Sequence, residues 1–321
     1  MLIASQDPGG KAYADRFRRF FLLQPMGLLR QHAVAMIKIN KSVALIAGPT
    51  ASGKSALALR LARDRGGVII NADALQVYRE LRILSARPGE AELAEAPHRL
   101  YGHVSGVEPY SVAAWLADAV AEIEAAWAGR LLPIVTGGTG LYFMALERGL
   151  AEVPPISPGI REKWRRFDGD IHGELLKRDP AAATKLKPND RQRLSRALEV
   201  IEGTGKPLSH WQAQAQSQAF LRDVKVERLL VDVPRAELYA RADARFDQML
   251  AAGALEEVKP LLNHDADLPM MRAIGVPELA RYLRDEISLK EAVSMAKTAT
   301  RHYIKRQFTW WRGQAAGWQK A

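Results

Sequence analysis

Residues 48–55 contain the groups in this sequence that are most clearly suited to chemistry. Glycines at fixed positions allow successive backbone N–H groups to curl around phosphate oxygens. A lysine adds positive charge, and a following hydroxyl can hold Mg²⁺. The segment reads Gly48, Pro49, Thr50, Ala51, Ser52, Gly53, Lys54 and Ser55, which fits the P-loop pattern G-x-x-x-x-G-K-[ST]. We therefore expect these eight residues to bind the phosphates of a ligand, with Mg²⁺ on Ser55.

The surroundings of this loop favour a phosphate site over a chance match. The apolar run 43–47 predicts a buried strand before the loop, and the alanine- and leucine-rich run 56–63 predicts a helix after it. The N-terminal dipole of that helix would point at the bound anion. The loop alone does not reveal which phosphate compound it binds.

Asp73 is the second residue that could do chemistry. It ends the apolar run 68–72, which predicts another strand. Ligands of open α/β sheets collect beyond the carboxyl ends of the strands, so Asp73 should face the same crevice as Lys54. Three roles remain open from the residues alone: a general base, an outer Mg²⁺ ligand, or the N-cap of a helix from Ala74 onward.

A third strand is predicted at 130–136, and it leads into the turn Gly137-Gly138-Thr139-Gly140. A helix is expected at 141–148. The glycine-rich turn could form a further anion site, but taken alone it favours a tight corner between strand and helix.

The composition changes at Pro154, Pro155 and Pro158, which suggest a boundary. Residues 160–216 are charged and helical in pattern, and a strand returns at 226–233. In the expected helix near 191–200, Gln192, Ser195, Arg196 and Glu199 share one face, which could equally be a solvated face. The predicted fold class is α/β: a P-loop NTPase-like parallel sheet flanked by helices, formed by 37–153 and 219–321, with an all-helical insertion at 154–218.

The ends of the chain differ from its middle. Residues 296–321 carry six Lys or Arg residues, no Asp or Glu, and three tryptophans. Such a segment can bind RNA through phosphates and unpaired bases, or it can be a solvated basic helix whose tryptophans fill the core. Residues 1–36 are predicted to be an extension that is disordered or not native, because Met36 could start a complete domain.

Overall composition sets broad limits on the protein. The 321 residues include 48% hydrophobic and 26% charged residues, with a formal net charge of +10. The absence of cysteine excludes disulfides, thiolate catalysis and Cys-ligated zinc, and it agrees with a cytoplasmic location. No stretch approaches the roughly 18 apolar residues of a membrane helix, so no membrane partner is expected.

Taken together, the segments resemble the bacterial tRNA dimethylallyltransferases, also called tRNA isopentenyltransferases. The resemblance runs from about Val43 to Trp311, and its motifs stand in the family's order. They are GPTASGKS (48–55), NADALQVY (71–78), APHRL (96–100), VTGGTGLYF (135–143), PNDRQRLSRALEV (188–200), RFDQMLAAG (245–253), MRAIGVPEL (271–279) and KRQFTWWRG (305–313).

The resemblance implies transfer of a dimethylallyl group from dimethylallyl diphosphate to the N6 amine of the adenine that is 3′-adjacent to the anticodon. The P-loop and Mg²⁺ would then hold a leaving diphosphate, with Asp73 as general base and Thr139 and Arg161 near the reacting groups. The partner would be the anticodon stem-loop of a tRNA, bound by a monomeric protein. The matching tRNA-contacting positions are Asp73, Ala74, Leu75, Gln76, Gln192, Arg193, Leu194, Ser195, Arg196, Arg272, Lys305, Arg306, Gln307 and Arg312.

The sequence departs from the family pattern at two positions of these motifs. Ala74 stands where the family usually has serine after the catalytic aspartate, and Val276 stands where many members have tyrosine. Two other functions compete with this interpretation. A P-loop small-molecule kinase would turn over ATP, and a non-catalytic RNA-binding protein would bind tRNA without forming product.

Overall fold

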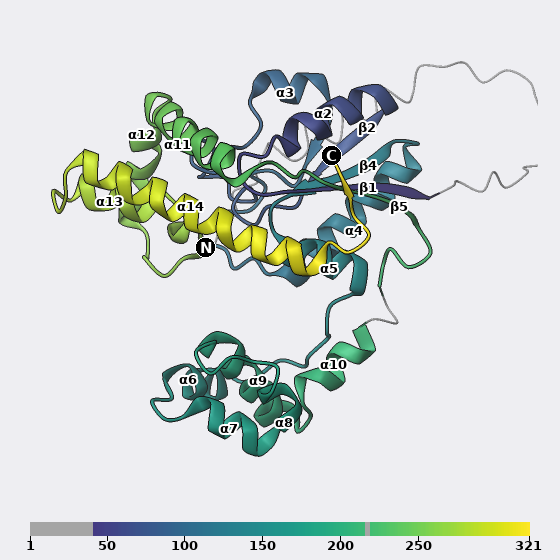
Figure 1. The fold of residues 1–321 in the computed structure, drawn as a ribbon, viewed down its shortest axis with the longest axis vertical. Coiled ribbons are helices and arrows are strands. Elements are labelled where there is room, and N and C mark those ends of the chain that lie inside the picture. Colours follow the sequence, from purple (N-terminus) through teal and green to yellow (C-terminus); the bar gives the residue numbers. More distant parts are fainter. Residues whose placement is uncertain (1–40, 216–218) are drawn as a thin grey trace, which may run out of the picture. The chain divides into compact units, whose positions relative to one another are not determined.

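The computed structural model describes residues 41–215 and 219–321. The extension predicted at 1–36 lies outside the described residues. Figure 1 shows the order and arrangement of the elements.

A six-stranded sheet forms the centre of the fold. Its strands are β1 (Ser42–Ala47), β2 (Gly67–Asn71), β3 (His98–Arg99), β4 (Leu132–Gly137), β5 (Lys225–Leu230) and β6 (Gln319–Lys320). They lie in the order β3-β2-β4-β1-β5-β6, and every pair is parallel. The strands β1, β2 and β4 are almost continuous apolar runs because helices cover both faces of a parallel sheet.

Helices pack on the two faces of this sheet through separate apolar clusters. Helix α2 (Lys54–Arg65) covers one face, where Ala58 and Ala62 meet Ile46 and Ile134. On the other face lie α4 (Val112–Ala128) and α5 (Gly140–Arg148), as Figure 1 shows. Their large side chains form part of the main core: Trp115, Ile123, Phe143 and Leu146.

The C-terminal part of the chain adds further helices to the main core. They are α11 (Arg235–Ala251), α12 (Ala254–Val258), the 3-10 helices η2 (Lys259–Asn263) and η3 (Pro269–Arg272), α13 (Val276–Leu283) and α14 (Leu289–Gln314). A capping box at Ser288 and Glu291 begins α14. The long helix returns the chain to the P-loop, which matters for the site described below.

Between α5 and β5, the described residues form helices and connecting loops and no strand. The helices are α6 (Pro158–Arg166), α7 (Ile171–Arg178), α8 (Pro180–Ala183), α9 (Arg191–Thr204) and α10 (Leu208–Ala215). Side chains at Ser157, Asp170, Asp179 and Asp190 cap the starts of four of them. These helices have their own apolar cluster, which includes Trp164, Leu175 and Leu198. The predicted fold class, a P-loop sheet interrupted by a helical insertion, is confirmed; the exact domain limits and the insertion's contact with tRNA stay predictions.

The structure also contains elements that the sequence did not indicate. Strands β3 and β6 are two residues long, too short for a periodic pattern. Helix α3 (Glu90–Glu95) is also short, and it begins with a capping interaction from Glu92. Within residues 41–215 and 219–321, no helix combines the length and apolar character needed to cross a membrane.

Candidate active site

The carboxyl ends of β1, β2 and β4 bring together the three segments that the sequence singled out. Ala47 pairs with Gly137, and Asn71 pairs with Thr136. The P-loop follows β1, Asp73 follows β2, and the Gly137–Gly140 turn begins at the end of β4. Adjacent strand ends therefore place the phosphate loop, the carboxylate and the glycine-rich turn at one edge of the sheet.

The P-loop has the backbone conformation that its glycines permit. Gly53 has φ 92° and forms the N-cap of α2, in the left-handed region that side chains disfavour. A Cβ on Gly48 would lie 2.7 Å from Ser52 Oγ, so the chain also needs a glycine at the first position. These two glycines allow the loop to turn tightly from β1 into the N-terminus of α2, where an anion is favoured.

Lys54 is the positive group of the loop. Its Nζ donates to the Pro49 carbonyl at 3.4 Å. Burial lowers the pKa of Lys54 to about 8, while the nearby Asp73 charge opposes this and Arg245 on α11 adds to it. Burial also lowers the pKa of Arg245, again opposed by Asp73. Two cations and one carboxylate thus act on each other at the edge where a phosphate would enter.

Asp73 lies in a turn just beyond β2, and no helix follows it. Its Oδ1 accepts the Leu75 N–H at 3.0 Å, and its own N–H donates to Asn71 Oδ1 at 2.9 Å. Asn71 is fully buried, which fixes the turn. The interpretation of Asp73 as an ordinary helix cap is therefore wrong: its carboxylate closes a two-residue turn. The second oxygen faces Gly138, where a Cβ on the glycine would lie 3.6 Å from it.

Thr139 contacts the turn that holds Asp73. Its Oγ1 accepts the Ala74 N–H at 3.0 Å, and its N–H donates to the Ala72 carbonyl at 3.2 Å. The two turns approach so closely that a Cβ on Gly137 would lie 2.1 Å from the Ala72 oxygen. The glycine-rich turn is thus a tight corner and, at the same time, a support for Asp73.

Gln307 on α14 joins the P-loop to the glycine-rich turn. Its Oε1 accepts the Thr50 N–H at 2.8 Å, and its Nε2 donates to the Gly138 carbonyl at 3.1 Å. The residue is only 5% exposed. Burial raises the pKa of the nearby Tyr303 hydroxyl. We call this arrangement the Gln307 bridge.

Comparison with known proteins places the chain in a family. The family described as IPP transferase matches residues 76–314. The chain belongs to this family. A tRNA dimethylallyltransferase of Nitrobacter hamburgensis is 54% identical over 277 residues, covering 84% of this chain and 87% of the relative. One from Azorhizobium caulinodans is 50% identical over 302 residues, covering 92% and 95%.

Solved structures of the IPP transferase family share the fold. A eukaryotic dimethylallyltransferase acting on tRNA aligns with a TM-score of 0.73 at 30% identity, covering 84% of this chain and 70% of that one. The tRNA isopentenylpyrophosphate transferase of Bacillus halodurans aligns with a TM-score of 0.63 at 32% identity, covering 86% and 88%. The resemblance seen in the sequence motifs is therefore confirmed.

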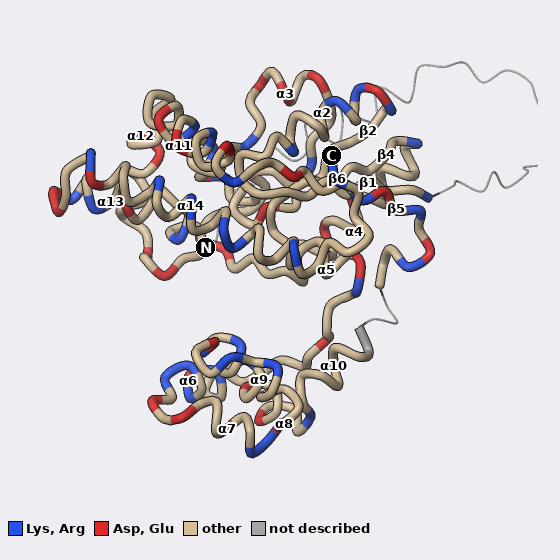
Figure 2. The backbone as a smooth tube through the Cα atoms, in the orientation of Figure 1, with Lys and Arg blue, Asp and Glu red and all other residues tan. Residues whose placement is uncertain are grey.

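The predicted tRNA-contacting residues divide by exposure. Six cationic or polar side chains are exposed, as is the predicted catalytic Arg161 on α6, and Figure 2 shows Lys and Arg along these elements. The six are Gln192 and Arg193 on α9, Arg272 on η3, and Lys305, Arg306 and Arg312 on α14; Arg196 on α9 is half-buried. Their contact with RNA stays a prediction.

Three of these residues are buried, and their contact with RNA also stays a prediction. Leu194 is fully buried, and Ser195 is 5% exposed with its Oγ donating to the Trp164 carbonyl at 3.2 Å. Gln307 is committed to the bridge described above. The face that Ser195 shares with Gln192, Arg196 and Glu199 is therefore divided: Ser195 and Glu199 are buried, whereas Gln192 is exposed and Arg196 is half-buried. Near Asp73, Gln76 Nε2 donates to the Ser85 and Ala86 carbonyls, which holds its side chain inward.

Sequence reasoning missed Arg245, although the motif RFDQMLAAG contains it. The signal that could have indicated it is its position: Arg245 directly precedes the buried Phe246, on a helix that ends near the main core.

The tertiary structure also decides whether a tryptophan of α14 lies in the core or on an RNA-binding surface. Trp311 is 4% exposed and packs against Phe143 and Trp318, so at this position the core explanation holds.

Proposed function

We propose that this protein transfers a dimethylallyl group from dimethylallyl diphosphate to the N6 amine of the adenine 3′-adjacent to the anticodon of tRNA. The observation that carries the proposal is the placement of Asp73 beside Lys54 and Arg245, between the P-loop and the glycine-rich turn. Names of the relatives, all tRNA dimethylallyltransferases, support the same activity.

The reaction balances with the groups at this edge of the sheet. The adenine amine nitrogen attacks C1 of the dimethylallyl group, and the C1–O bond to the diphosphate breaks. The electron pair of that bond stays on the diphosphate oxygen, and one amine proton passes to the Asp73 carboxylate. Because Oδ1 of Asp73 already accepts the Leu75 N–H, Oδ2, on the Gly138 side, is the oxygen that we assign to the proton.

The leaving diphosphate needs compensation for the charge it gains. Lys54, with a pKa of about 8, is mostly protonated at pH 7, and Arg245 adds a second cation. The N-terminus of α2 contributes backbone N–H groups. Since the donor carbon is attacked and no phosphorus bond breaks, the loop serves here to hold a leaving group.

The residues present also fit a magnesium ion at this place. Ser55 is exposed at the start of α2, and it lines a pocket with the buried, unpaired hydroxyl of Thr136. Hydroxyl and carboxylate oxygens are the ligand type that Mg²⁺ prefers. When bound, the ion would neutralise charge on the diphosphate.

For the acceptor, we propose the anticodon stem-loop of a tRNA, bound in the cytoplasm by a monomeric enzyme. The adenine must leave its stack to reach Asp73, which costs a few kcal/mol, less in a loop than in a duplex. Exposed cations on α9 and α14 supply charge for the RNA phosphates. Thr139 would orient the Asp73 turn during the reaction, and Arg161 would contact the substrates from α6.

One assay separates this function from a kinase and from a non-catalytic RNA-binding protein. Purified protein is incubated with unmodified tRNA, Mg²⁺ and radiolabelled dimethylallyl diphosphate, and RNA-bound label is counted. We expect label in RNA that contains the target adenine and none in tRNA lacking it. Turnover of ATP without labelled RNA, using several competent tRNAs, would contradict the proposal.

The role of Asp73 has its own test. Asp73→Asn preserves the size of the side chain but removes the base, so single-turnover transfer should fall about 10²-fold or more. Affinity for tRNA should stay close to wild type in a filter-binding assay. Normal single-turnover chemistry with weakened tRNA binding would instead assign Asp73 to RNA recognition.

A further inference from the structure

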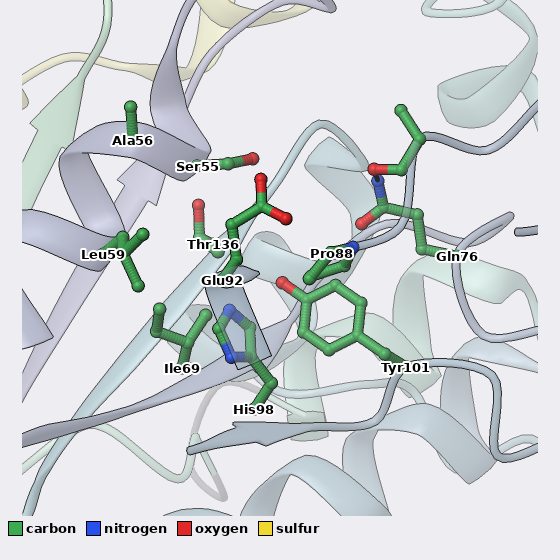
Figure 3. A pocket seen from close by; sticks show the side chains of 11 residues that line it. Ser55, Ala56, Leu59, Ile69, Gln76, Pro88, Glu92, His98, Tyr101 and Thr136 are labelled. Atoms are coloured by element: carbon green, nitrogen blue, oxygen red, sulfur yellow. Dashed lines mark hydrogen bonds between the residues drawn. The ribbon is translucent and has the colours of Figure 1, made fainter. Parts of the chain in front are cut away.

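A pocket of about 150 Å³ opens beside the P-loop on the α2 side of the sheet. Figure 3 shows the hydroxyls of Ser55 and Thr136 and the carboxylate of Glu92 directed toward this space. The Tyr101 hydroxyl and the amide of Gln76 line it as well. The pocket has room for several water molecules.

Thr136 is the unusual member of this pocket. It is 3% exposed, and its Oγ1 makes no hydrogen bond within the protein. It stands on β4 after the buried residue Ile134, which faces the same side of the sheet. A buried hydroxyl without a partner costs about 1–3 kcal/mol, whereas valine has the same shape and favours strands. An unpaired hydroxyl directed into a pocket thus points to a partner that arrives from solvent.

The position of Thr136 indicates which partner this is. In P-loop proteins, Mg²⁺ lies between the loop Ser or Thr and an aspartate on a second strand. Here β4 is hydrogen-bonded to β1, and Thr136 pairs with Ile46, two residues before Gly48. On the other side of β1, Asp232 lies two residues beyond the end of β5 and forms an ion pair with Lys320 at 2.6 Å.

The charges in the pocket exclude a phosphate group as the occupant. Glu92 contributes a carboxylate, and no Lys or Arg is among the described residues that line the space. Burial lowers the pKa of His98, which keeps that ring neutral near pH 7. A site with one carboxylate and several neutral oxygens suits a hydrated divalent cation.

We propose that the Thr136 hydroxyl, together with Ser55 Oγ, binds the hydrated Mg²⁺ that accompanies the diphosphate. This inference rests on the proposed function. In this proposal the neutral Thr136 hydroxyl takes the metal-binding position that a carboxylate occupies in P-loop nucleotide hydrolases. Glu92 supplies negative charge at the far side of the pocket.

The test uses Mg²⁺ and inorganic diphosphate as probes, and it does not depend on turnover. Thermal unfolding of the full chain is followed while MgCl₂ is titrated at a fixed diphosphate concentration. Free diphosphate binds Mg²⁺ identically in every sample, so differences between variants in the Mg²⁺ titration measure how well each protein binds Mg²⁺ together with diphosphate. Thr136→Val should need about tenfold more Mg²⁺ for half-maximal stabilisation, as expected for one lost contact to a charged group. Thr136→Ser keeps the hydroxyl and should resemble wild type, while Ser55→Ala should be impaired like Thr136→Val.

Each other result decides against the proposal. Equal Mg²⁺ titrations for wild type and Thr136→Val would remove Thr136 from the metal site and leave the proposed function intact. If wild type shows no Mg²⁺-dependent stabilisation by diphosphate, the metal part of the proposed function fails as well. The ligand-free Thr136→Val protein should unfold at the same temperature as wild type or higher. A clear loss of stability there would mean that the hydroxyl has a partner inside the protein, which would also overturn the proposal.

Discussion

Removing the Gln307 bridge tests whether this residue supports the P-loop or contacts RNA. Gln307→Ala leaves the Thr50 N–H and the Gly138 carbonyl without their partners. A buried, unsatisfied backbone group costs about 1–3 kcal/mol, and water entering the space would lower this cost. We therefore expect a loss of about 2–4 kcal/mol in the free energy of unfolding. In a protein larger than 250 residues this corresponds to a drop of about 4–10 °C in Tm.

The loss of the bridge should also be visible in binding. Because Thr50 belongs to the P-loop, freeing its N–H should weaken binding of inorganic diphosphate about three- to tenfold, the value of one hydrogen bond. The affinity for tRNA, measured by filter binding, should change little. Gln307→Glu retains an acceptor for Thr50 but places a buried carboxylate oxygen against the Gly138 carbonyl, so near neutral pH its loss of stability should be at least as large as that of Gln307→Ala.

Two exposed residues of the same segment provide matched controls. Lys305→Ala and Arg312→Ala should retain the Tm and the diphosphate affinity, and they should weaken tRNA binding if this segment contacts RNA. Should Gln307→Ala behave like these controls, with normal stability and a selective loss of tRNA affinity, the structural role of the bridge would be refuted.

Three further predictions concern other parts of the chain. Burial sets the Lys54 pKa near 8, so the affinity for diphosphate should fall by up to about tenfold per pH unit above pH 8, where the lysine loses its proton. The affinity is measured by calorimetry as a function of pH. Lys54→Met is the control: its pH dependence reflects the titration of diphosphate alone and should lack the additional fall. Gly137→Ala should lower the free energy of unfolding, measured in urea melts, by about 3 kcal/mol or more, because the added Cβ would clash with the Ala72 carbonyl oxygen. A Cβ at Gly159 would have no atom within 4 Å, so the control Gly159→Ala should change the free energy of unfolding by less than about 1 kcal/mol. If the exposed Arg193 guanidinium neutralises a phosphate, Arg193→Ala should reduce by about one the slope of the logarithm of the tRNA binding constant against the logarithm of the salt concentration. An unchanged slope would argue against that contact.

Several features of the fold and site could be predicted because they depend on local sequence. The strands before the P-loop, before Asp73 and before the glycine-rich turn are apolar runs, and each is observed within about two residues of its predicted position. Parallel pairing of such strands brings their carboxyl ends together, so the meeting of Lys54 and Asp73 followed from the pattern. Family membership followed from eight motifs in a fixed order.

Other features depend on contacts between distant parts of the chain. Gln307 lies 257 residues beyond Thr50, and no local pattern distinguishes a glutamine that bridges two loops from one on an RNA-binding surface. Ser195 and Leu194 were assigned to RNA contact, but the packing of α9 against α6 turns both inward. Helical periodicity defines which residues share a face, whereas the neighbouring elements decide whether that face is covered.

The sequence by itself thus determined the phosphate loop, the strands that present it and the family. These properties arise from backbone freedom at glycine, from apolar runs and from short motifs, all of which act over a few residues. Only the tertiary structure decided which side chains support the site, namely the Gln307 bridge, Arg245 beside Asp73, and the unpaired Thr136 hydroxyl. The reason is physical: burial, hydrogen-bond pairing and electrostatic proximity depend on the folded arrangement of residues that are far apart in the chain.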